Sequence, residues 1–182
     1  MLYFSSDLHL YHHNVLKYAN RLFKDVREMH KEFVKNHNAI VNEDDEFWFL
    51  GDLCIASPEF VGKMRKIVDS MNGVKHIVLG NHDDWKARSY LNAGFTTAHT
   101  AAWLYHEGLK FYMMHDPAEY AVVEKEENAV LLCGHIHQLF KHLLPGKRVI
   151  NVGLDVWDYK PVSIEQIVEL LKEHDVFSGA IP

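Results

Sequence analysis

The chain contains little cysteine, no long apolar run and no excess of positive charge, and each of these absences excludes a class of protein. Only two of its 182 residues are cysteines, Cys54 and Cys133, which is too few for a disulfide framework. Cysteines used this sparingly are typical of buried, reduced thiols, so we expect a cytoplasmic protein. No apolar run approaches the ~20 residues of a membrane span, and the N-terminal Met1 to Phe4 lacks the basic region of a signal peptide.

The charge balance is acidic, with 19 lysines and arginines, 25 aspartates and glutamates, and a formal net charge of -6. This balance argues against an extended surface for nucleic acid or for an anionic membrane. Hydrophobic residues make up 48% of the chain, which is enough for a substantial core at this length. We therefore expect residues 1–182 to form one domain, with residues 176–182, which show no periodicity, as a loose tail.

Apolar runs of strand length alternate with segments of helical periodicity. Helices are expected over residues 26–41, from residue 57 after a Ser-Pro start, and over 85–93 and 164–173. Strands are expected over residues 2–6, 46–50, 76–79, 98–106, 109–114, 130–133 and 148–151. Alternation of this kind predicts an α/β layered fold, and the hairpin signal at Glu107-Gly108 indicates that the sheets are not wholly parallel.

Residues that can bind a metal ion follow five of these apolar runs. They are Asp7, His9, Asp52, Asn81, His115, His135 and His137. The carboxyl ends of strands are where sites form in open α/β sheets, so we expect these side chains to converge. Seven ligands are too many for one tetrahedral zinc and suit two ions about 3.5–4 Å apart that share one carboxylate. The mixture of oxygen and nitrogen donors favours manganese, with iron, nickel or zinc as alternatives.

These residues, read in order, resemble the signature of the calcineurin-like metallophosphoesterases. The blocks are Asp7-x-His9, Gly51-Asp52, Gly80-Asn81-His82-Asp83, His115 and Gly134-His135-x-His137. The resemblance implies a four-layer αββα sandwich, in which two mixed sheets flanked by helices hold a dinuclear site between them. It also implies that one ion is held by Asp7, His9 and His137, that the other is held by Asn81, His115 and His135, and that Asp52 bridges the two.

Two further segments, residues 12–23 and 151–163, resemble a small bacterial and phage branch of this family. The chain also departs from the family, because many relatives carry an acidic residue where this chain has Ile55. The metal ligands are unaffected, but any substrate contact that this acid makes elsewhere is in question. Candidate substrate contacts of this chain are His12, His13 and Arg21, the last as a clamp on phosphate.

The activity expected from this resemblance is hydrolysis of phosphoester bonds, phosphodiesters above all, by a hydroxide that bridges two divalent ions. His82 is the expected proton donor to the leaving group, and Asp83 is expected to orient His82 and favour its protonated form. The expected partner is a small phosphorylated substrate, a nucleotide being one candidate, and the oligomeric state is open. Two alternatives stand: a phosphomonoesterase or pyrophosphatase on the same site, and a non-catalytic interaction module.

Overall fold

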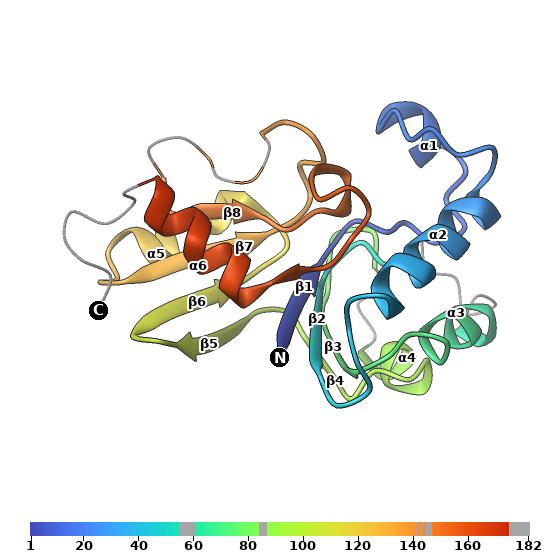
Figure 1. Cartoon of the computed structure of the whole chain (residues 1–182), viewed down its shortest axis with the longest axis horizontal. Coiled ribbons are helices and arrows are strands. Elements are labelled where there is room, and N and C mark those ends of the chain that lie inside the picture. Colours follow the sequence, from blue (N-terminus) through green and yellow to red (C-terminus); the bar gives the residue numbers. More distant parts are fainter. Residues whose placement is uncertain (55–60, 84–86, 141, 143, 145–146, 175–182) are drawn as a thin grey trace.

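Two mixed β-sheets face each other in the computed structural model, which describes residues 1–54, 61–83, 87–140, 142, 144 and 147–174 (Figure 1). The first sheet has the strand order β4-β3-β2-β1-β9 and the second has the order β5-β6-β7-β8. The strands of the first sheet are β1 (Leu2–Ser5), β2 (Glu46–Leu50), β3 (Val74–Val78), β4 (Thr97–His99) and β9 (Val162–Ser163). Those of the second are β5 (Ala102–His106), β6 (Leu109–Met113), β7 (Ala129–Cys133) and β8 (Val149–Asn151).

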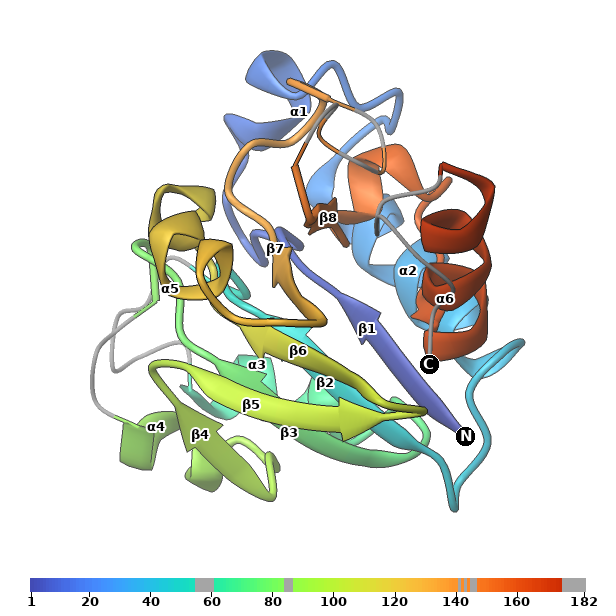
Figure 2. The same cartoon turned by 90° about the vertical axis from the view of Figure 1, so that its left-hand side faces the viewer.

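Parallel pairing decides where the chemistry can lie. The strands β1, β2, β3 and β4 pair in parallel, as do β6, β7 and β8, whereas β9 and β5 pair antiparallel with β1 and β6. Figure 2 shows the second sheet lying across the first. The carboxyl ends of parallel strands lie on one edge of their sheet, so the loops that follow these strands can meet.

Helices cover the outer face of each sheet. On the outer face of the first sheet, Phe33, Phe47 and Tyr90 belong to one buried cluster that joins the helices to β2 and β3. On the outer face of the second sheet, Val123 of the short helix α5 packs in a buried cluster with Leu131 of β7 and Val149 of β8. The helices are α1 (Val15–Tyr18), α2 (Val26–Asn38), α3 (Val61–Val68), α4 (Ala87–Asn92), α5 (Ala121–Glu124) and α6 (Ile164–Glu173), with 3-10 turns η2 (Pro117–Tyr120) and η3 (Leu154–Val156).

The core between the sheets is separate from the helix-covered one. It contains Phe4 and Leu50 from the first sheet, Phe111 and Leu132 from the second, and Ile167 from α6. Because successive side chains of a strand point to opposite faces, Phe49 packs against the helices while Leu50 packs between the sheets. The expected sandwich of two mixed sheets flanked by helices is confirmed.

The ends of the long helices follow local chemistry. The Asp25 side chain accepts hydrogen bonds from the N–H groups of Arg27 and Glu28, which caps the first turn of α2. The Glu28 side chain returns to the N–H of Lys24 rather than to that of Asp25, so the reciprocal capping box is incomplete there. A complete one begins α6, between Ser163 and Gln166.

One expected strand is wrong. Residues 98–106 do not form a continuous strand, because 97–99 pair with β3 in the first sheet and 102–106 pair with β6 in the second. The chain passes from the first sheet to the second between these two segments. The predicted hairpin at Glu107-Gly108 is present and joins β5 to β6. The expected Ser-Pro helix start, Ile55 and the tail from residue 176 lie outside the described residues. No helix in the described part is long and apolar enough to cross a membrane.

Candidate metal centre

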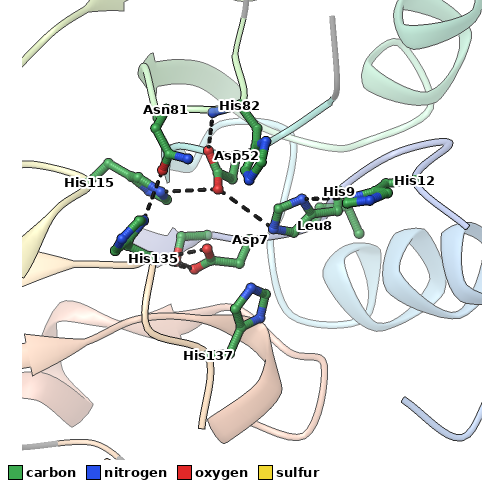
Figure 3. A network of polar contacts seen from close by, with 12 residues as sticks. Asp7, Leu8, His9, His12, Asp52, Asn81, His82, His115, His135 and His137 are labelled. Carbon is green, nitrogen blue, oxygen red and sulfur yellow. Dashed lines mark hydrogen bonds and ion pairs between the residues drawn. The ribbon is translucent and has the colours of Figure 1, made fainter. Parts of the chain in front are cut away.

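The loops after β1, β2, β6 and β7 bring six of the predicted ligands into two groups (Figure 3). The first group is Asp7, His9 and His137, and the second is Asp52, His115 and His135. Within each group, one potential ligand atom per residue lies within 4.8 Å of the others. Residues up to 130 positions apart in the sequence are thus brought to one place, as the pattern predicts.

Asp52 lies between the two groups. Its Oδ2 atom is 3.6 Å from Nε2 of His9 and 3.2 Å from Nε2 of His115. Both Nε2 atoms are buried, and neither has a hydrogen-bond partner in the described part of the chain. Buried polar atoms without a partner are rare because they cost free energy, and a cation beside Asp52 would satisfy both. The residues therefore fit a pair of metal ions.

Burial and the contact between Asp52 and His115 set the protonation states of this group. Burial lowers the pKa of His9 to about 3, which leaves its imidazole neutral. Burial by itself would raise the pKa of Asp52 and lower that of His115, but their mutual contact outweighs it and moves them to about 2 and about 9. Asp52 is thus ionised and His115 carries a proton that a metal ion would replace.

The backbone of these loops is held in an uncommon conformation. Five of the seven predicted ligands have positive φ angles; these are Asp7 (62°), His9 (53°), Asp52 (56°), His135 (75°) and His137 (46°). Non-glycine residues seldom adopt this left-handed region, and such strain concentrates at functional sites where the surroundings impose it.

Two glycines permit the close approach of the ligands to the backbone. A Cβ atom on Gly80 would collide with the carboxylate of Asp52, and one on Gly134 would collide with Ser6 and with Oδ2 of Asp7. The neighbouring groups cannot move away, because Asp7 also accepts hydrogen bonds from Ser6 Oγ (2.6 Å) and from the His135 N–H (3.0 Å). The glycines before Asn81 and His135 are thus required by packing around the ligands.

Asp83 has a different role from the one expected. Its buried carboxylate accepts hydrogen bonds from four backbone N–H groups and one hydroxyl; the donors are Asp52, Leu53, Cys54, Gly80 and Tyr90. No hydrogen bond joins it to His82 among the described residues. The prediction that Asp83 orients His82 is therefore wrong, and Asp83 instead fixes the loop of Asp52 against that of Asn81.

Asn81 and His82 lie on the exposed side of the centre. Oδ1 of Asn81 is 2.8 Å from Nδ1 of His135, which places the amide beside the second group of ligands. The N–H of His82 donates to Oδ1 of Asp52 (2.9 Å), and its exposed ring lies 5.4 Å from that of His9. His82 is thus next to the predicted ligands while its side chain faces solvent.

A tyrosine that sequence reasoning missed completes the rim. The Tyr18 hydroxyl lies 3.2 Å from Nδ1 of His12, and its ring is 5.4 Å from that of His137. His12 in turn lies against His9, with 5.4 Å between ring centroids. His13 is exposed and takes no part in these ring contacts. Nothing in the sequence marks Tyr18, because only the α1 turn brings it over the site.

Arg21 is not placed to hold phosphate. Its guanidinium is buried and engaged with the Asp155 carboxylate and with the carbonyl oxygens of Asp7 and Leu8. The geometry therefore argues against the clamp expected from the sequence. Asp155 itself was missed, although it follows the strand β8 as the predicted ligands follow theirs. Burial alone would raise the pKa of Asp155, but hydrogen bonds from Arg21 and His137 lower it.

Comparison with known proteins identifies the family of this chain. The sequence model of the calcineurin-like phosphoesterase superfamily domain matches residues 1–163. The chain belongs to this superfamily. Membership of this superfamily, together with the two candidate ligand groups, supports a hydrolase.

Two curated proteins and one solved structure are similar to this calcineurin-like phosphoesterase domain. An uncharacterized protein of Methanocaldococcus jannaschii is 32% identical over 179 residues, with 96% of this chain and 93% of that protein covered. The Gene 66 protein of Mycobacterium phage L5 is 26% identical over 201 residues, with 93% of each covered. A crystal structure of a protein of unknown function from Aquifex aeolicus has a TM-score of 0.73 at 24% identity and covers 93% of this chain and 98% of its own, which shows a shared fold.

Proposed function

We propose that this protein is a phosphodiesterase that depends on two divalent metal ions. The observation that carries the proposal is the placement of Asp52, whose Oδ2 lies between two buried Nε2 atoms that have no hydrogen-bond partner in the described residues. A shared carboxylate between two sets of ligands is the arrangement of two-metal hydrolytic sites. Manganese remains the favoured ion from the donor set, with iron, nickel or zinc as alternatives.

Charge explains why phosphate would be drawn to this place on an acidic protein. Two divalent ions bring four positive charges, and the carboxylates of Asp7 and Asp52 remove two. The site would then be positive, whereas the chain as a whole carries a formal net charge of -6. Such ions supply Lewis acidity toward the phosphoryl oxygens and ionise water near neutral pH.

The protein side chains have separate tasks in this proposal. Asp83 and the two loops that it joins hold Asp52 in place, and the buried His9 and His115 present nitrogen donors. The exposed His82 lies beside them, so its imidazolium can donate a proton to the leaving oxygen. A proton donor matters most for a poor leaving group, which favours diesters of alcohols such as those of nucleotides.

A cytoplasmic location stays a prediction from Cys54 and Cys133, which are both free thiols.

The proposal is tested with metal-free protein, to which Mn²⁺ is added before turnover is measured. Matched nitrophenyl substrates, one a diester and one a monoester, separate the diesterase from a monoesterase. Asp52→Asn should abolish metal-dependent turnover. Asp45→Asn removes a carboxylate that is also buried but is paired with the N-terminal amine, and it should not abolish turnover. Faster turnover of the monoester would favour the alternative hydrolase, and metal binding without any turnover would favour the interaction module.

The role of His82 has its own test. His82→Asn should slow hydrolysis of a diester with an alkoxide leaving group far more than one with nitrophenolate, because the better leaving group needs no proton. General acid catalysis typically contributes about 10²–10⁴-fold. Equal losses on the two substrates, with metal content unchanged, would contradict this role.

A further inference from the structure

His137 is held by a carboxylate that lies outside the predicted ligand set. Its Nδ1 atom is 2.6 Å from Oδ2 of Asp155. An ionised carboxylate can only accept a hydrogen bond, so Nδ1 carries a proton, and in the neutral ring Nε2 keeps its lone pair. This tautomer is the one that a histidine needs when it binds a metal through Nε2, and a carboxylate behind the ring commonly fixes it.

Asp155 is in turn fixed by Arg21 through two parallel hydrogen bonds. Nε of Arg21 donates to Oδ1 (2.7 Å) and Nη2 donates to Oδ2 (2.8 Å), and both side chains are 0% exposed. The same guanidinium donates to the carbonyl oxygens of Asp7 and Leu8. One arginine thus connects the support of His137 to the loop that carries Asp7 and His9, which are the other two members of that ligand group.

The segment of Asp155 is itself attached to the first strand. It lies in η3 directly after Gly153, which forms a bridge with Ser6, and the N–H of Leu154 donates to the Ser6 carbonyl (3.2 Å). The carboxylate is therefore placed by the same backbone that places Asp7.

The second ligand group has weaker support. Nδ1 of His115 donates to the backbone carbonyl of Leu50 (2.8 Å), and Nδ1 of the exposed His135 faces the Asn81 amide. Neither histidine contacts a buried carboxylate through Nδ1 in the part of the chain that the structure describes. A neutral carbonyl or amide makes the imidazole less basic than a carboxylate does.

We propose that Asp155, held by Arg21, is a positioning residue that fixes the tautomer and direction of His137 and thereby makes the Asp7, His9 and His137 site the tighter of the two metal sites. This inference rests on the two-metal centre of the proposed function. The two sites then differ in metal affinity, and the difference comes from Arg21 and Asp155, which do not themselves bind metal. It also gives Arg21 a role in place of the phosphate clamp.

The test measures binding of Mn²⁺ to metal-free protein by calorimetry, without any turnover assay. Wild type should bind two ions in two steps. Asp155→Asn should weaken the tighter step by about 10–100-fold and leave the weaker step unchanged. Asp45→Asn, which also removes a buried carboxylate from an ion pair but lies away from the centre, should change neither step.

A second variant guards against loss of the fold, because Asp155→Asn leaves the buried guanidinium without a counter-charge. Arg21→Gln combined with Asp155→Asn removes both charges, and such neutral replacements of buried pairs are often tolerated. It should weaken the same step. In metal-free protein, nitrogen NMR of the His137 ring should show the Nδ1-protonated tautomer for wild type and a loss of that preference for both variants, which a merely structural role would not produce.

Each result distinguishes this inference from the proposed function. Two binding steps with the same affinities in wild type and in both variants would overturn the positioning role alone. Equal weakening of both steps would also overturn it, since the effect is expected at one site. Binding of no ion, or of a single ion, by wild type would overturn the two-metal centre and this inference together.

Discussion

Acid should destabilise this protein through His37, a fully buried histidine of α2 that is remote from the metal centre. Its Nε2–H donates to the Asn72 carbonyl (2.9 Å), and its ring packs 4.5 Å from that of Phe47. Nδ1 is buried and has no partner in the described residues, so a second proton there would be a buried charge without an acceptor. Burial lowers the pKa of His37 to about 4, the Asn72 carbonyl opposes this, and Lys75 adds to it.

The sign and size of the effect follow from that pKa. The unfolded chain binds the proton with a pKa near 6.5, so between pH 6.5 and about 4 protonation favours the unfolded state. The contribution of His37 to the free energy of unfolding is complete above about pH 6.5. It decreases as the pH falls and levels off below the pKa of the folded state, about 4. At about 1.36 kcal/mol per pH unit, the loss from His37 alone between about pH 7.5 and about pH 4.5 is about 2.5 kcal/mol.

Urea unfolding of metal-free wild type and His37→Gln, followed by tryptophan fluorescence at a series of pH values, isolates this contribution. The glutamine can still donate to the Asn72 carbonyl but cannot titrate. The stability difference between the two proteins should shrink by about 2.5 kcal/mol as the pH falls over that range. His106→Gln on the β5–β6 hairpin controls for the substitution itself. If the difference in free energy of unfolding between wild type and His37→Gln did not change with pH, the argument that His37 is neutral in the folded protein would be refuted.

Three further substitutions probe the centre. Gly134→Ala should lower the amount of bound Mn²⁺, because its Cβ would displace Asp7. The control Gly62→Ala in α3 has open space around it, so it should leave metal binding intact and raise the free energy of unfolding by about 0.5–1 kcal/mol. Equal metal content in the two variants would count against the steric argument. Asp83→Asn should cost about 1–3 kcal/mol in urea unfolding, because an amide cannot accept all the donors that converge there; unchanged stability would contradict this. Tyr18→Phe should lower turnover without changing bound metal, and an unaltered rate would remove Tyr18 from the rim of the site.

Residue chemistry and order were readable along the chain because they depend on local pattern. Asp52 and His115 each follow the end of a short apolar strand by two residues, and the helix expected from residue 26 begins at Val26. The sequence pattern predicts one strand over residues 98–106, where the structure has two, because no glycine or proline separates the two halves. Which sheet each half joins is decided by distant strands that no local pattern encodes.

The kinds of ligand, their sequence order and the family follow from the amino-acid sequence, since carboxylates, an amide and imidazoles after strands carry that information themselves. The hydrogen-bond partners of the charged side chains cannot be predicted from the sequence in this way. Asp83 was assigned to His82 and Arg21 to phosphate, whereas Asp83 fixes two loops and Arg21 holds Asp155. Buried charges take whichever donors the packed backbone brings within hydrogen-bond distance. That choice is made only when segments 31 to 134 residues apart come together, so it belongs to the tertiary structure.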